Sequence, residues 1–318
     1  MRAAFRSRSK LVILVVAALV PLLVFSAFIV YRNAAKQHEL REQGMRDTVR
    51  ALSLAADGEV KAAAAVLHTL AASSYLDARD FQSFHRLCVM ALAGRQGAWV
   101  VLFDPSGQQI VNSSRPFGAP LPNPLRDTQA VAAAVGYPRL ALGGAAPVRK
   151  VLDTRQSVVS DLFVGLDSRK PAIGVGIPVV RDGVVRYVLE MSVDPDSVLQ
   201  MLRSQQLPQQ SIAAVLDGNG NVIARTLESR ESVGQPLMPE LAHQVSKAPA
   251  GSGAARMRDG TLVYHAHTRS NVTGWIVSLA VPQAPVSAQS REAIFLLVGG
   301  AALAMLVAFL AAPRTRPS

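Results

Sequence analysis

The sequence is short of cysteine, and Cys88 is the single one among its 318 residues. A disulfide framework within the chain is therefore excluded. Cys88 lies in an apolar stretch of helical spacing with Phe84, Leu87 and Leu92, where a thiol acts as a small buried hydrophobic group rather than as a nucleophile. The six histidines do not stand at the spacings of zinc sites. We therefore expect neither a metal ion nor an organic cofactor.

The sequence also lacks the motifs that carry catalysis. It contains no nucleophile elbow, no phosphate-binding loop and no kinase signature. We expect that the chain is not an enzyme.

Acidic residues are fewer than basic ones, which gives a formal net charge of +11. Much of this excess stands at the two ends of the chain, in Arg2, Arg6, Arg8, Lys10, Arg314 and Arg316. The remaining basic residues are spread thinly, and no run of Lys and Arg is interleaved with aromatic residues, which make up only 5% of the chain. Nucleic acid is therefore not expected as a partner.

Two long apolar segments, residues 11–31 and 293–312, contain no charged side chain. Each has about the 20 residues that a helix needs to cross a bilayer. Basic flanks favour the cytoplasmic side, so residues 1–10 and 313–318 are expected to be cytoplasmic and residues 32–292 periplasmic. The sequence thus predicts a multi-pass protein of the bacterial inner membrane, with the lipid bilayer as one partner.

A cleavable signal peptide is the alternative for residues 11–31, because it also combines a basic start with an apolar core. Phe25, Ser26 and Ala27 offer a small-residue cleavage site. The apolar run is longer than the usual 7 to about 15 residues of a signal peptide, which favours a membrane helix.

The pattern between the two apolar segments is that of a folded α+β domain. Residues 33–70 contain no proline and repeat apolar side chains at steps of three and four, which predicts one long helix. Shorter helices are expected at residues 80–93, 128–135 and 197–205, the second within an otherwise irregular, proline-rich region at 114–150. Strands are expected at residues 98–103, 108–112, 157–164, 172–180, 184–193, 212–216, 221–226, 261–268 and 275–281.

A strand, turn and strand pattern occurs twice. Residues 102–111, LFDPSGQQIV, align with residues 215–224, VLDGNGNVIA. A duplicated unit of about 110 residues, each copy a small antiparallel sheet flanked by helices, explains this recurrence.

This arrangement resembles the double Cache extracytoplasmic sensor domains of bacterial receptors. The resemblance covers residues 32–312 and rests on the order of the elements and on three stretches: residues 157–165, SVVSDLFVG; residues 170–179, KPAIGVGIPV; and residues 274–277, GWIV. It implies an α+β fold with two tandem PAS-like antiparallel sheets on a long N-terminal helix, flanked by two transmembrane helices. The implied units are the long helix at 33–70, a membrane-distal PAS-like unit at 71–196, and a linking helix with a membrane-proximal PAS-like unit at 197–292.

The resemblance also implies a function. Members of the family bind a small-molecule ligand in the membrane-distal unit, and the second membrane helix passes the signal to a kinase, chemotaxis or cyclase module. We therefore expect a membrane-anchored sensor, the input part of a signal-transduction receptor such as that of a two-component system. Because only residues 313–318 follow the second apolar segment, the output is expected from a cytoplasmic signalling partner or from a module that the sequence lacks.

Two further expectations concern the ligand and the oligomer. Amino-acid-binding members carry a set of Tyr, Arg and Trp before the third strand and an Asp on the last strand, but that aromatic set is not found here and Ser192 stands about where the Asp would be. The resemblance therefore does not extend to an amino-acid ligand.

A homodimer through the long helix is expected, because the apolar stripe of this helix exceeds what one small sheet can cover.

Side-chain alternation predicts a binding face on two neighbouring strands. The odd positions from 173 to 179 are bulky and apolar, whereas the even positions from 172 to 178 are Ala, Gly, Gly and Pro. A glycine inside a strand often marks the close approach of another group. The polar side chains of the next strand, residues 184–193, share one face, which a tight hairpin would place beside these glycines. The candidate ligand-binding residues are Asp161, Gly174, Gly176, Arg186, Glu190 and Ser192.

Alternatives stay open for the face and for the function. The face could instead be exposed to water, with Arg186 and Glu190 as a weak ion pair, and Asp161 could merely end a strand. The alternative function is a membrane-anchored interaction or assembly subunit whose outer domain binds a protein partner. Large exposed side chains on the face would favour that subunit, and a closed pocket lined by small residues would favour the sensor.

Overall fold

The computed structural model describes residues 2–126, 136–137, 139–257, 259–283 and 299. The chain divides into two compact units, residues 1–44 with 282–318 and residues 45–281. The predicted helix at 128–135 and, apart from Gly299, the predicted membrane segment at 293–312 lie outside the described residues. Among the residues that are described, no helix has both the length and the apolar character needed to cross a bilayer.

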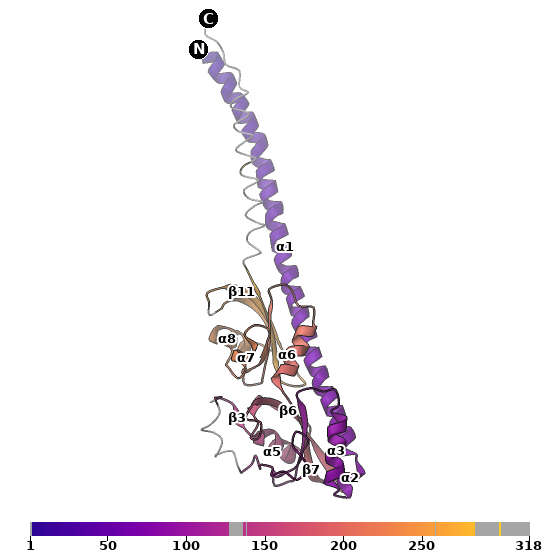
Figure 1. The fold of residues 1–318 in the computed structure, drawn as a ribbon. Helices are drawn as coiled ribbons and strands as arrows, with labels where there is room; N and C mark the ends of the chain where they lie inside the picture. Colours follow the sequence, from indigo (N-terminus) through magenta and orange to yellow (C-terminus); the bar gives the residue numbers. More distant parts are fainter. Residues whose placement is uncertain (1, 127–135, 138, 258, 284–298, 300–318) are drawn as a thin grey trace. The chain divides into compact units, whose positions relative to one another are not determined.

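The longest element is α1 (Arg2–Ala71), one continuous helix (Figure 1). It confirms the helix predicted at 33–70 and begins well before it. Along residues 45–71 the apolar side chains that recur at steps of three and four, such as Val49, Leu52 and Val60, are buried. They form one face of the helix, as amphipathic spacing requires.

Two sheets of the same chain cover this face of α1. One hydrophobic core joins Leu52 and Val60 of the helix with Ile177 of the first sheet and with Val215 and Leu279 of the second. The apolar stripe therefore needs no second chain to cover it, and the sequence argument for a homodimer fails. The homodimer itself stays a prediction.

The first sheet has the strand order β2-β1-β7-β6-β5-β3, with β4 also paired to β6. Its strands are β1 (Ala98–Phe103), β2 (Gln109–Asn112), β3 (Ala141–Leu142), β4 (Val158–Val159), β5 (Phe163–Val164), β6 (Pro171–Arg181) and β7 (Val184–Val193). The helices of this region are α2 (Ser74–Asp77), α3 (Phe81–Ala91) and α5 (Ala145–Thr154). Asp182 and Gly183 both have positive φ angles, as a two-residue hairpin turn requires, so β6 and β7 pair as predicted.

The strand predicted at 157–164 is wrong in one respect, because it is divided into β4 and β5. The Ser160 N–H still donates a hydrogen bond of 2.8 Å to the Gly174 carbonyl of β6, and from the Ser160 carbonyl onward the backbone contacts the second sheet. The carbonyl of Ser160 accepts a hydrogen bond of 3.3 Å from Trp275 Nε1, and the Leu162 N–H donates one of 3.2 Å to Asp217 Oδ2. These long-range bonds replace the ladder bonds that a continuous strand would make.

The region at 114–150, predicted to be irregular apart from the helix at 128–135, contains most of α5. Pro147 lies in the first turn of this helix, where a proline costs no hydrogen bond. Val148 and Val151 are buried and pack with Phe103 and Val188 in a second, smaller core. This core lies on the opposite side of the first sheet from α1.

The second sheet has the order β10-β11-β12-β8-β9. Its strands are β8 (Ile212–Leu216), β9 (Val222–Arg225), β10 (Ala250–Arg256), β11 (Leu262–Arg269) and β12 (Ile276–Pro282), and its helices are α6 (Pro195–Ser204), α7 (Ser229–Ser232) and α8 (Pro239–Lys247). The sequence did not predict α8 or β10. Two glycines give β10 a low intrinsic strand propensity, and its pairing with β11 along all seven residues decides its conformation.

The two sheets repeat one topology. The order β9-β8-β12-β11-β10 matches β2-β1-β7-β6-β5, and the ladder shifts register at the same relative place, between Leu102 and Phe103 and between Val215 and Leu216. Asp104 and Asp217 occupy equivalent turns, and the Oδ1 atom of each accepts hydrogen bonds from the backbone N–H groups two and four residues later. The fold is therefore α+β with two repeated sheets. The predicted unit boundaries at 71–196 and 197–292 stay predictions.

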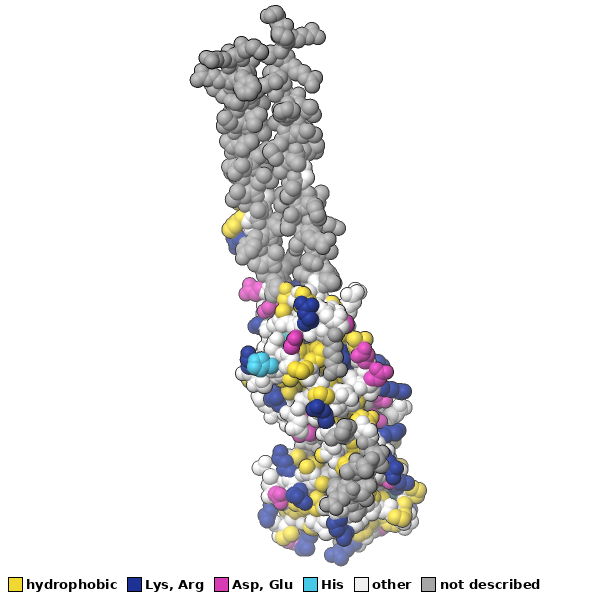
Figure 2. Space-filling model, turned by 90° about the vertical axis from the view of Figure 1, so that its left-hand side faces the viewer, with side chains coloured by type: hydrophobic (Ala, Val, Ile, Leu, Met, Phe, Trp, Pro, Cys, Tyr) yellow, Lys and Arg dark blue, Asp and Glu magenta, His cyan; other side chains and the backbone are white. Residues whose placement is uncertain are grey.

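Charged side chains are scattered over the described surface. On the face that Figure 2 shows, Lys and Arg side chains lie among acidic and hydrophobic ones rather than in one patch. Such a mixed distribution is typical of a face in contact with water.

Candidate functional site

The hairpin of β6 and β7 brings four of the predicted site residues together. Gly174 pairs with Ser192 and Gly176 pairs with Glu190. Glu190 is 3% exposed and Ser192 is 2% exposed, whereas Arg186 is exposed. The alternative of a wet face with an Arg186–Glu190 ion pair is therefore wrong, because Glu190 is buried.

Two groups cover this face of the sheet. A Cβ atom at Gly176 would lie 3.2 Å from a methyl group of Val151, which belongs to α5. A Cβ atom at Gly174 would lie 2.9 Å from Cδ of Glu190. The two glycines thus leave room for a helix and for a buried carboxyl group, as close approach to a strand requires.

A small cavity of about 110 Å³ lies beside Glu190 and Ser192. Its wall comes from β1, β2, β5, β7 and the residues that directly follow β2, β3 and β5: Trp99, Val101, Phe103, Gln109, Asn112, Ser114, Gly143, Phe163, Gly165, Leu166, Asp167, Ser168, Glu190 and Ser192. The wall holds two carboxylates and no Lys, Arg or His side chain among the described residues. The cavity is therefore electrostatically suited to a cation.

The carboxyl group of Glu190 is incompletely bonded. Oε1 accepts a hydrogen bond of 2.9 Å from Ser192 Oγ, but Oε2 is buried and has no hydrogen-bond partner. Burial raises the pKa of Glu190 to about 7, against a smaller lowering by the Ser192 hydrogen bond. An unsatisfied buried polar atom costs about 1–3 kcal/mol, so a ligand that donates a hydrogen bond to Oε2 would remove this cost.

The edge of the cavity is held by an ion pair. Arg115, which follows β2, donates two hydrogen bonds to the carboxylate of Asp167, which follows β5. A guanidinium that pairs with a carboxylate in this two-bond geometry fixes both groups. The contact ties together two segments that border the cavity.

Several wall residues were missed by the sequence reasoning. Trp99 and Phe163 are large aromatic residues in predicted strands. Strand side chains alternate between the two faces of a sheet, and these two side chains lie on the face that lines the cavity. Asp167 lies in a turn whose position beside Arg115 follows only from the fold. The pairing of Ser192 with Glu190 had a visible signal, since the two are separated by two positions in one strand.

Asp161 lies outside this cavity. Its Oδ1 accepts a hydrogen bond of 2.8 Å from the Gly218 N–H, and its Oδ2 accepts one of 2.9 Å from Asn219 Nδ2. Both partners belong to the turn between β8 and β9, so Asp161 connects the two sheets.

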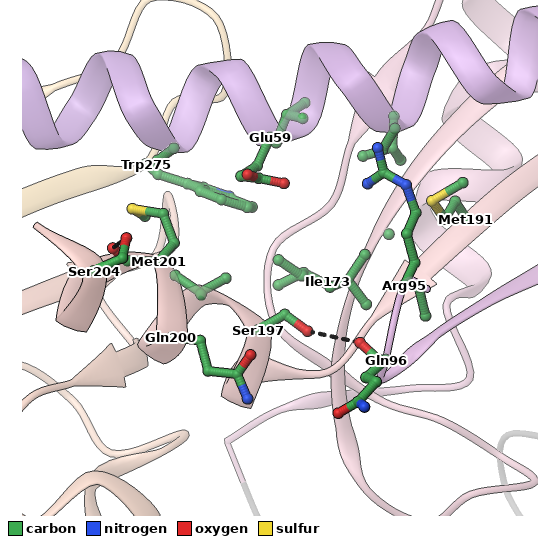
Figure 3. Close-up of a pocket in the computed structure, with 18 of the residues that line it drawn as sticks. Glu59, Arg95, Gln96, Ile173, Met191, Ser197, Gln200, Met201, Ser204 and Trp275 are labelled. Carbon is green, nitrogen blue, oxygen red and sulfur yellow. Dashed lines mark hydrogen bonds between the residues drawn. The ribbon is translucent and has the colours of Figure 1, made fainter. Parts of the chain in front are cut away.

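A second cavity, of about 410 Å³, lies on the α1 side of the first sheet (Figure 3). It is bordered by α1, β6, β7, α6, the segment after α3, and Trp275. Met191, adjacent in sequence to Glu190, points to this side because strand side chains alternate between faces. The two cavities are therefore separated by the sheet.

No protein-family model matches the sequence, and no curated protein matches it. Solved structures do match. The extracellular domain of a protein assigned as a histidine kinase has a TM-score of 0.60 at 16% identity, covering 80% of this chain and 98% of that one. The ligand-binding domain of a Campylobacter jejuni chemoreceptor in complex with L-valine has a TM-score of 0.56 at 10% identity, covering 80% and 97%.

A third match is the ligand-binding domain of a Pseudomonas aeruginosa amino acid chemoreceptor in complex with L-arginine. Its TM-score is 0.58 at 12% identity, and the match covers 79% of this chain and 98% of that one. The fold is that of the double Cache sensor domains. This confirms the predicted resemblance. At such low sequence identities, the comparison shows a shared fold.

Proposed function

We propose that the protein is a membrane-anchored extracytoplasmic sensor whose small-molecule ligand binds in the cavity beside Glu190. The unpartnered, buried Oε2 of Glu190 carries this proposal. A carboxyl group in such a place is destabilising without a ligand, and the double Cache fold is shared with sensory domains. A concave site with an unpartnered buried acid favours a sensor over an assembly subunit.

The ligand that fits this chemistry is a small amine. Its ammonium group would pair with the ionised form of Glu190 and donate a further hydrogen bond to the amide oxygen of Gln109. Asp167 is already paired with Arg115, and Asn112 Oδ1 already accepts two hydrogen bonds from Ser114. L-Valine and L-arginine, bound by two of the similar structures, also carry an ammonium group. No cationic side chain of the described wall is available for a ligand carboxylate, so an amine without a carboxylate fits better than an amino acid. A cavity of about 110 Å³ admits only a few non-hydrogen atoms.

The rest of the receptor follows from the sequence. Residues 11–31 and 293–312 would anchor the chain in the inner membrane, which places residues 32–292 in the periplasm. The signal would pass through the second membrane helix to a cytoplasmic signalling module or partner. The chain would act by binding and not by catalysis, and the receptor would be a homodimer.

The test is amine binding by the full chain in lipid nanodiscs. Isobutylamine, L-valine and isobutyrate would be compared by thermal shift and calorimetry at pH 8. We expect isobutylamine to bind most tightly and isobutyrate not to bind. Glu190→Gln should abolish amine binding, while the control Asp153→Asn, at an exposed acid on α5, should not change it. Unchanged amine affinity in Glu190→Gln, or binding of isobutyrate alone, would contradict the proposal.

A further inference from the structure

The larger cavity on the α1 side of the first sheet has the features of a second ligand site. Its volume of about 410 Å³ lies in the range of small-molecule pockets, about 300–1,000 Å³. Five helices and strands border it, α1, β1, β6, β7 and α6, and each contributes to the main hydrophobic core. The cavity is therefore formed mainly by helices and strands of the packed core rather than by surface loops.

Most of the wall is apolar. Val60 of α1, Ile173 of β6, Met191 of β7 and Met201 of α6 line it together with Trp275 (Figure 3). The indole ring of Trp275 is held in place, because its Nε1 donates to the carbonyl of Ser160 and its side chain is buried. Methionine and aromatic side chains offer an adaptable apolar surface, which suits the hydrocarbon or aromatic body of a ligand.

Two charged side chains face the same space. Figure 3 shows the carboxylate of Glu59 and the guanidinium of Arg95 turned toward the cavity. Arg95 is half-buried and makes no side-chain hydrogen bond or ion pair with any described residue, whereas Glu59 is exposed. Partial burial removes water from the guanidinium without supplying a counter-ion, so Arg95 has more to gain from a ligand than Glu59.

We propose that this cavity binds an organic anion with an apolar body, whose carboxylate pairs with Arg95. Guanidinium and carboxylate groups form charge-assisted, two-bond pairs, and the apolar body would lie against Trp275 and Met201. The site lies on the opposite face of the sheet from Glu190 and takes a ligand of opposite charge, so it does not depend on the proposed amine site.

The position of the site gives it a regulatory consequence. The cavity is bounded by β6 and β7 of the first sheet and by Trp275, which precedes β12 of the second. A ligand that contacts both would bind best to one arrangement of these elements and would shift the population toward it.

The probe for the test is 3-phenylpropionate, added to the full chain in nanodiscs. Calorimetry gives the affinity, and the fluorescence of Trp275, with Trp99 replaced by Phe, reports contact with the indole. We expect binding with a change in Trp275 emission. Arg95→Gln should weaken binding by about 10-fold or more, the value of one charge-assisted pair, and Glu59→Gln should strengthen it by removing a like charge.

Three controls decide between this site and others. Arg86→Gln, at an exposed arginine of α3, and Glu190→Gln should both leave the affinity for 3-phenylpropionate unchanged. The neutral 3-phenylpropanol should bind at least 10-fold more weakly than the acid. The proposal is overturned by unchanged binding in Arg95→Gln, by equal binding of the alcohol, or by loss of binding in Glu190→Gln.

Discussion

Ser192 Oγ donates a hydrogen bond of 2.9 Å to Oε1 of Glu190, two positions earlier on the same face of β7. The hydroxyl thereby bonds one carboxylate oxygen and leaves the other, Oε2, buried without a partner. The strand thus presents a buried acid that is held in place and whose pKa is raised to about 7. Four predictions concern this pair, the contact of Asp161 with the second sheet, and the buried His265.

The first prediction concerns the apo protein and pH. The pKa of Glu190 is raised by burial to about 7, so the folded protein holds the proton more tightly than the unfolded chain. Protonation of Glu190 therefore adds to the free energy of unfolding. This contribution is fully present below the ordinary pKa of a glutamate and is lost as the pH rises through about 7. Denaturant titrations at pH 4.5 and pH 8 should show a loss of about 3 kcal/mol from this group. Glu190→Gln should remove that part of the pH dependence, and an unchanged pH slope would contradict the assignment.

The second prediction concerns the amine ligand and pH. An ammonium group pairs with the ionised form of Glu190, so its affinity should rise by about 10-fold between pH 6 and pH 8. Ser192→Ala removes the hydrogen bond that lowers the pKa of Glu190 and should move this rise to higher pH. Calorimetry with isobutylamine at half-unit pH steps measures both. If the midpoint moves to lower pH in Ser192→Ala, the hydrogen bond does not stabilise the ionised form.

The third prediction concerns Asp161. Its carboxylate accepts hydrogen bonds from the Gly218 N–H and from Asn219, so Asp161→Ala should lower the free energy of unfolding by about 1–3 kcal/mol. The change lies outside both cavities and should leave the affinity for isobutylamine as it is. Urea denaturation measures the first effect and calorimetry the second. Loss of amine binding at full stability would instead place Asp161 in the ligand site.

The fourth prediction concerns His265 in β11. Both of its ring nitrogens are buried without hydrogen-bond partners, and burial, followed by the charge of His267, lowers the pKa of His265. The folded form therefore binds the proton less well than the unfolded chain, and stability should fall as the pH drops below about 6.5. Denaturation at pH 7.5 and pH 5.5 measures this fall in a Glu190→Gln background, where the opposite pH dependence of Glu190 is absent.

The matched variant is His265→Phe, which fills similar space without a titrating group. It should be at least as stable as the parent protein at pH 7.5 and should lose less stability at pH 5.5. A fall of the same size in the variant would assign the pH dependence to another group.

The local sequence determined most of the elements. Strands at 98–103, 184–193 and 212–216 have the predicted bounds, because apolar alternation and turn residues fix a strand between its neighbours. The helix predicted at 80–93 is present as α3, and Asp80 caps it with its Oδ1 accepting from the Ser83 N–H. The repeat of the strand order was also visible in the sequence, through the two aspartate turns.

The sequence also determined the composition of the site face. Alternation alone placed Glu190 and Ser192 beside Gly174 and Gly176, because residues two apart in a strand point to the same side. Alternation could not show whether this face is exposed to water or covered by protein. The answer depends on α5, whose apolar side chains pack over the sheet, and the sequence pattern of α5 does not reveal which strands it covers.

Only the tertiary structure decided the remaining features. β4 and β5 are separate because Ser160 and Leu162 bond to the second sheet, and Asp161 contacts a turn 57 residues away along the chain. The larger cavity arises where α1, α6 and Trp275 approach the first sheet. Contacts between residues so distant in sequence leave no periodic signal in the sequence, because periodicity reports only which side of an element a residue occupies and not what packs against it.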